Sequence, residues 1–94
     1  MSEPTVRLDS LPEAVVALLR AVHEALDIPL PGLTDADERA YARLSEYRLR
    51  DTRVILAGVL DEGHEVSGAA EALRTWTEQT PVTHTPWTDG GGAA

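Results

Sequence analysis

The segment from Leu33 to Ala57 contains neither glycine nor proline, and this uninterrupted run constrains the fold more than any other feature. Glycine and proline are the residues that most disfavour a helix interior, so a run of this length favours one long helix. Thr34 is a suitable N-cap, and the acidic residues after it complement the positive end of a helix dipole. Gly63 suits the left-handed position that ends many helices. We predict one helix over about 35–61.

Asp51 falls on the predicted apolar stripe of this helix. The stripe consists of Ala40, Tyr41, Leu44, Tyr47, Val54, Ile55, Gly58 and Val59. Two structures agree with the pattern: a continuous helix in which Asp51 pairs with Arg48, three residues earlier, or a helix that breaks near 49–52. We favour the continuous helix.

A shorter helix is predicted before the long one, over about 11–26. Ser10 and Glu13 have the spacing of a capping box, and Pro12 falls in the first turn, where its missing N–H costs nothing. The apolar residues that follow recur at helical spacing. They are Leu11, Val15, Leu18, Leu19, Val22 and Leu26.

The segment 27–33 between these two helices contains Pro29 and Pro31. Two prolines at this spacing exclude helix and favour an extended connector. Apolar residues alternate with them, namely Ile28, Leu30 and Leu33. We therefore expect the connector to lie on the core and to cover one end of the helices.

A third helix is predicted over about 66–79, with Ser67 as the N-cap. Its apolar face consists of Ala69, Ala70, Ala72, Leu73 and Trp76. The remaining 80–94 is rich in threonine, proline and glycine, so this tail should be extended or disordered. Residues 1–9 are polar, and we expect them to be mobile.

These elements predict an all-α fold, a three-helix bundle in a single domain over 10–79 with an extended C-terminal tail. A chain of 94 residues is too short for a Rossmann fold or a barrel enzyme. The run 54–60 is apolar all round a helix, which is more than a three-helix monomer readily covers. We therefore expect a homodimer that shares this run.

The amino-acid composition excludes several kinds of functional site. There is no cysteine, which excludes disulfides and thiolate metal sites, and no lysine, which indicates the codon usage of a GC-rich, bacterial genome. The net charge is −8, yet 35–53 is balanced, with five acidic residues and five arginines. No signal peptide, lipidation motif or membrane span is recognisable, so we expect a soluble, cytoplasmic protein.

Four arginines lie along one stripe of the long helix: Arg39, Arg43, Arg50 and Arg53. One interpretation is a solvated face with two ion pairs, Asp35–Arg39 and Glu46–Arg50. The other is a binding face for an acidic partner, a phosphate, a nucleic acid or the acidic face of a second copy. Four arginines in a chain of net charge −8 are a weak nucleic-acid signature.

A helix-turn-helix over 54–79 is the alternative that would give a nucleic-acid-binding or transcription-regulating accessory protein. Its recognition helix would present Arg74 as the one basic residue, beside Glu71 and Glu78. Recognition helices read bases and phosphates with hydrogen-bond donors and positive charge, which this helix lacks. Nucleic acid is thus a less favoured partner.

No catalytic, metal or cofactor site is expected. His23, His64 and His84 lie in separate regions without a zinc-binding spacing, and we interpret them as surface or capping residues. Nucleophile-elbow and phosphate-loop patterns are absent from the sequence. We therefore predict that the protein is not an enzyme.

The tail segment 80–87 is the clearest functional indication. Trp87 is either folded back on the helices or, together with Val82, an anchor of a linear peptide that docks on a partner. We predict a small, acidic, non-enzymatic interaction or regulatory module. Its contact surfaces would be the tail and the face that carries Arg39, Arg43, Arg50 and Arg53.

Overall fold

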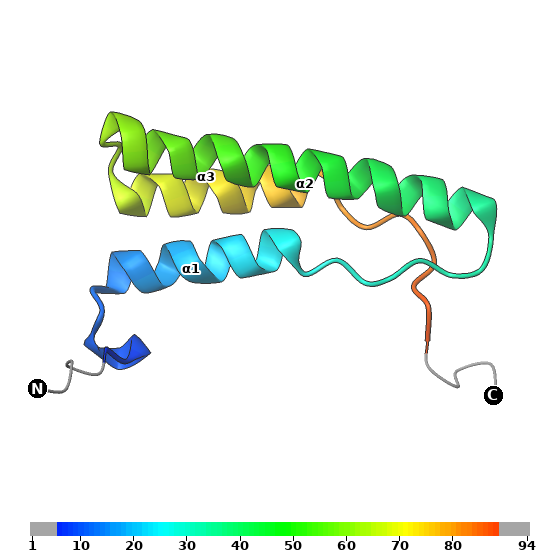
Figure 1. The fold of residues 1–94 in the computed structure, drawn as a ribbon, viewed down its shortest axis with the longest axis horizontal. Coiled ribbons are helices and arrows are strands. Elements are labelled where there is room, and N and C mark those ends of the chain that lie inside the picture. The colour runs from blue at the N-terminus through cyan, green and yellow to red at the C-terminus, as the bar shows by residue number, and fades with distance from the viewer. Residues whose placement is uncertain (1–5, 89–94) are drawn as a thin grey trace, which may run out of the picture.

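The computed structural model describes residues 6–88, and within them the chain forms an all-α three-helix bundle. A short 3₁₀ turn, η1 (Leu8–Ser10), precedes α1 (Glu13–Leu26), α2 (Asp35–Glu62) and α3 (Val66–Gln79). Helix α2 has 28 residues and α1 and α3 have 14 each, so the shorter helices line only part of α2. Figure 1 shows α3 running back alongside α2, with α1 on the other side of the bundle.

The signals at the ends of α2 are confirmed. Thr34 Oγ1 accepts a hydrogen bond of 3.0 Å from the Asp37 amide, which satisfies one of the free N–H groups of the first turn. Gly63 has φ 71°, and its amide and that of His64 both bond the Gly58 carbonyl. Because a left-handed backbone is strained for residues with a Cβ, glycine at position 63 ends the helix at low cost.

The two shorter helices begin differently from the prediction. Ser10 does not cap α1: its hydroxyl closes η1 by donating to the Arg7 carbonyl at 2.6 Å, and Pro12 is the residue before α1. Ser67 does not cap α3 either. Its hydroxyl donates to the carboxylate of Glu65, which itself occupies the N-cap position. Both serines bond a residue that precedes them in the chain, and capping patterns do not reveal such competition.

The core lies where the three helices meet. Its buried members are Leu18, Ala21, Ala25, Ile55, Ala69, Ala70 and Leu73. Leu73 is fully buried at the centre, and the alanines around it let the helix backbones approach closely. The expected apolar face of α3 is confirmed, whereas Leu19 and Leu26 of α1 are about half exposed.

The inward face of α2 agrees in part with the predicted stripe, because Leu44, Ile55 and Gly58 are buried as predicted, while Arg48 and Thr52 join them. Tyr47 and Val54 are exposed instead. The helix is turned so that Arg48 points inward, where its guanidinium bonds the ends of the other helices. The helix is continuous through Asp51, as predicted, but the described residues contain no Arg48–Asp51 ion pair within 4.0 Å.

The connector 27–33 is extended, as predicted, but it pairs with the tail and does not bury its leucines. The Gly32 amide donates to the Thr85 carbonyl at 2.8 Å, and the Trp87 amide donates to Leu30 at 2.7 Å. These bonds form an antiparallel bridge at Pro31 and Pro86. Leu30 and Leu33 are 59% and 90% exposed, because the backbone pairing decides which way the side chains point. In Figure 1 the two segments cross beside α2.

Among residues 6–88, no helix combines the length and the hydropathy needed to cross a bilayer. The predicted mobile N-terminus lies outside the described residues up to position 5. The predicted extended or disordered tail lies outside them from position 89. The described part, 80–88, is extended.

Candidate interaction surface

Arg48 holds the start of the tail against the helices. Its Nη1 donates to the Ala25 carbonyl at 2.9 Å, Nη2 to the Thr80 carbonyl at 2.6 Å, and Nε to Thr80 Oγ1 at 3.0 Å. Ala25 lies in the last turn of α1, and Thr80 directly follows α3. One guanidinium therefore satisfies carbonyls at the negative ends of two helices. Burial lowers the pKa of Arg48 and nearby Asp51 raises it, yet an arginine remains charged throughout.

His84 fastens the tail further along, and it is buried, which corrects the expected surface position. Its Nε2 lies 2.9 Å from the Pro29 carbonyl oxygen. A carbonyl only accepts hydrogen bonds, so Nε2 carries the hydrogen. The ring meets the Tyr41 ring edge-on, with centroids 5.6 Å apart. The tail is thus tied to both the connector and α2.

Asp37 completes this attachment, because its Oδ1 accepts a hydrogen bond of 2.9 Å from the Thr85 amide. A Cβ at Gly32 would come within 3.2 Å of the Thr85 carbonyl oxygen and within 3.0 Å of the Asp37 carboxylate. A glycine at position 32 therefore permits the close approach of connector and tail.

Tail attachment should weaken in acid. The hydrogen bond from Thr85, and then the Thr34 side chain, hold the pKa of the Asp37 carboxyl below its ordinary value of 3.8. Since the folded-state pKa is the lower one, the stabilisation is complete above the unfolded value and is lost as the pH falls through the folded value. We expect the Thr85 amide resonance in NMR spectra to titrate at a pH below 3.8. Asp37→Asn should abolish that titration.

Asp35→Asn is the matched control, because Asp35 lies in the same first turn but does not contact the tail. It should leave the Thr85 titration unchanged. A titration of the Thr85 amide that persists in Asp37→Asn would contradict the assignment of Asp37 as the acceptor.

The attached tail forms one wall of a groove beside α2, with a volume of about 260 Å³. The lining residues are Ala40, Arg43, Leu44, Tyr47, Gln79, Thr80, Pro81 and Thr83. A second hollow, of about 380 Å³, lies between α2 and α3. It is lined by Val54, Ile55, His64, Glu65, Gly68, Ala69, Ala72 and Trp76. We call these two hollows together the α2–α3 groove.

One flank of α2 joins the two hollows. Arg43, Tyr47, Arg50 and Val54 follow each other at spacings of four, three and four, so they share a face of the helix. The Arg50 guanidinium lies 5.3 Å from the centroid of the Tyr47 ring, a cation–π contact. The two hollows therefore have largely apolar linings, with Arg43 and Arg50 along one side and the carboxylate of Glu65 in the second hollow.

The four predicted arginines are all exposed, and among residues 6–88 none of them pairs with a carboxylate. Within residues 6–88 the ion pairs shorter than 4.0 Å join His64 to Glu62 and, at that limit, Arg7 to Asp9. The expected Asp35–Arg39 and Glu46–Arg50 pairs do not form. Arg43 lines the groove and Arg50 stacks beside it, whereas Arg39 and Arg53 lie further round the helix.

The two predicted tail anchors are also exposed, but they do not share the groove. Val82 is 39% exposed and lies between the groove-lining Pro81 and Thr83. Trp87 is 45% exposed and lies at the connector, where its amide is bound by Leu30. Arg43 and the first residues of the tail therefore line the same hollow, whereas Trp87 lies outside it.

Arg48 and His84 are the residues that sequence reasoning did not find. A signal for Arg48 was present, because it follows Leu44 by four residues and precedes Thr52 and Ile55 at helical spacing. His84 had no such signal, because its burial depends on a connector more than 50 residues away in sequence, with which it bonds at Pro29.

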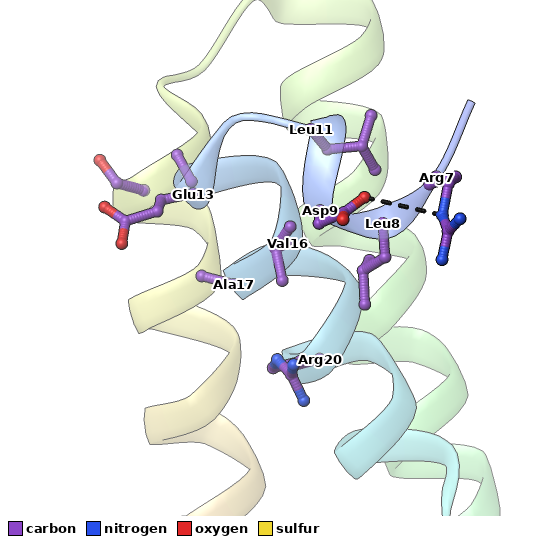
Figure 2. Close-up of a pocket in the computed structure, with 10 residues that line it drawn as sticks. Arg7, Leu8, Asp9, Leu11, Glu13, Val16, Ala17 and Arg20 are labelled. Carbon is purple, nitrogen blue, oxygen red and sulfur yellow. Dashed lines mark ion pairs between the residues drawn. The ribbon is translucent and has the colours of Figure 1, made fainter. Parts of the chain in front are cut away.

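A larger hollow, of about 940 Å³, lies between η1 and the start of α1. Figure 2 shows Leu8, Val16 and Ala17 along it, with Arg7 and Asp9 paired at its rim. The hollow is widely open to solvent, and its polar groups do not converge on one point. We assign no chemistry to it.

In the part of the chain that the structure describes, no group of three histidine, aspartate or glutamate side chains is arranged to hold a metal ion. Comparison with protein-family models, with curated proteins and with solved structures yields no match.

Proposed function

We propose that the protein is a small, non-enzymatic interaction module whose α2–α3 groove binds an acidic, partly apolar segment of a protein partner. The observation that carries this proposal is the pair of exposed arginines, Arg43 and Arg50, beside an apolar groove. Neither is paired with a carboxylate within residues 6–88. A guanidinium that is not paired and lies next to an aromatic ring is a typical hot spot of protein interfaces.

A protein partner is favoured over a nucleic acid by the charge around the groove. The whole chain carries a net charge of −8, and the outward side of α3 presents Glu71 and Glu78. Phosphates along an extended backbone would be repelled beyond the two arginines. The side-by-side arrangement of α2 and α3 also differs from the steep crossing of a helix-turn-helix. A short acidic peptide, by contrast, needs positive charge only where its own carboxylates bind, and Arg43 and Arg50 supply it there.

The tail supports the proposal in two ways. Its first residues form a wall of the groove, and Arg48 holds them in place before any partner arrives. Such preorganisation lowers the entropy lost on binding. Val82 and Trp87 remain exposed on the attached tail, and we propose them as secondary contacts at the edge of the surface.

A selection from a library of random short peptides displayed on phage tests this function. We expect the wild-type protein to enrich sequences that combine Asp or Glu with one or two apolar residues. Synthetic peptides of this type should bind with a dissociation constant of about micromolar order, more weakly at high salt. The double variant Arg43→Glu with Arg50→Glu should lose the enrichment.

Arg74→Glu is the matched control, because Arg74 is an exposed arginine on α3 outside the groove. It should retain the wild-type enrichment. Enrichment of peptides without acidic residues, or equal loss in the control, would refute the proposal. Salt-sensitive retention of the protein on duplex DNA that requires Arg43 and Arg50 would favour the nucleic-acid alternative instead.

A further inference from the structure

A second face of α2 lies beyond the α2–α3 groove and remains uncovered. Its residues alternate at spacings of three and four, the pattern of helices that pack along one another. They are the exposed residues Arg39, Ala42, Glu46, Leu49, Arg53 and Leu60, together with Leu56, which is half-buried at the border of the core. Leu49 is 56% exposed and Leu60 is 78% exposed, although both are large apolar side chains. We call this set the outer face of α2.

The charges on the outer face are not satisfied within the chain. Neither Glu46 nor Arg53 forms an ion pair among residues 6–88. They lie seven residues apart, about 10 Å along the helix axis, which is too far for them to reach each other. Both side chains are exposed, so each is free to pair with an opposite charge on another molecule.

The outer face is complementary to itself when two copies run antiparallel. If Glu46 faces Arg53 of the second copy, the two-fold axis places Arg53 opposite Glu46 of that copy, which gives two ion pairs. The same register brings Ala42 level with Ala57 of the second copy, an exposed residue at the edge of the outer face, and these two small side chains allow a close approach. In this register the Leu49 side chains of the two copies lie next to each other at the two-fold axis. A parallel arrangement would instead place Glu46 against Glu46 and Arg53 against Arg53.

We propose that the protein self-associates by antiparallel pairing of α2 with α2 of a second copy, through the outer face. The two-fold interface is isologous, as in most homodimers, and it buries Leu49 and Leu60. Among the residues of the apolar run 54–60, Leu60 enters this interface, whereas Val54 lies on the groove flank. The α2–α3 groove stays open, so the dimer is independent of the proposed function.

Sedimentation equilibrium of the full chain at micromolar concentrations tests the dimer. We expect a mass of twice 10.1 kDa for the wild type. Leu49→Asp should give the monomer mass, because it places two buried carboxylates at the axis. Circular dichroism of each variant verifies that the helices remain folded.

Charge reversal tests the register. Glu46→Arg alone and Arg53→Glu alone should each raise the dissociation constant of the dimer by about tenfold or more, because each replaces two attractive pairs with two repulsive ones. The double variant should regain wild-type association, and Arg43→Glu, on the groove flank, should not alter it. A wild-type mass of 10.1 kDa throughout, or a double variant no better than the single ones, would overturn the proposal.

Discussion

Arg48→Met should lower the free energy of unfolding by about 3 kcal/mol, because it removes charge-assisted hydrogen bonds to two buried helix ends. Methionine keeps a long apolar stem, so most of the packing survives and the loss falls on the guanidinium. The Ala25 and Thr80 carbonyls would be left without the Arg48 donors in a site from which water is largely excluded. Urea denaturation followed by circular dichroism measures the change. For a domain of this size the melting temperature should fall by roughly 10–25 °C.

Two controls separate the hydrogen bonds from charge alone. Arg50→Met removes an arginine two residues away on the exposed side and should change stability by less than about 0.5 kcal/mol. Arg48→Lys keeps the positive charge but cannot reach both carbonyls with one ammonium, so it should recover only part of the loss. Equal stability of Arg48→Met and the wild type would show that these carbonyls find other donors.

Leu73→Ala should have a comparable effect, about 3 kcal/mol, for an entirely different reason. Leu73 is fully buried in a core whose other buried members are Leu18, Ile55 and four alanines. Alanines cannot move in to fill the space, since they have no rotatable side chain, so most of the deleted volume remains as a cavity. The same denaturation experiment measures the loss, with an unchanged dependence on urea concentration if the unfolding remains two-state.

Leu33→Ala is the control for this prediction, because Leu33 is 90% exposed at the end of the connector. Its effect should lie within about 0.5 kcal/mol of zero. From the sequence alone a larger loss of stability would be expected for Leu33→Ala, because the alternating apolar residues of the connector predict that Leu33 is buried. A loss for Leu33→Ala as large as that for Leu73→Ala would refute the exposed connector.

The dimer and the groove use adjacent faces of one helix, which gives α2 a central part in both proposals. Arg43 and Arg50 border the groove, while Glu46 and Arg53 lie on the outer face. Two copies joined through α2 would carry two grooves related by two-fold symmetry. A partner with two acidic segments would then bind with a higher effective affinity than either segment alone.

The sequence alone predicted the helices correctly, because their signals are local. Thr34 and Gly63 mark the ends of α2 through bonds and backbone angles that involve only a few neighbouring residues. The exposure of Arg39, Arg43, Arg50 and Arg53, four of the five arginines of α2, also follows from helical spacing. The Ser10 and Ser67 caps failed at the same local level, because each hydroxyl bonds the residue three or two positions before it and not a helix amide.

The sequence by itself thus determined the all-α class and the three helices, since helical periodicity and the signals at helix ends act within one or two turns. Only the tertiary structure decided which side of α2 turns inward, that Arg48 joins the ends of α1 and α3, and that the tail is fastened at His84 and Asp37. The physical reason is that these choices depend on carbonyls and amides left free at distant chain positions. These carbonyls and amides find their partners only after folding has brought the distant segments together.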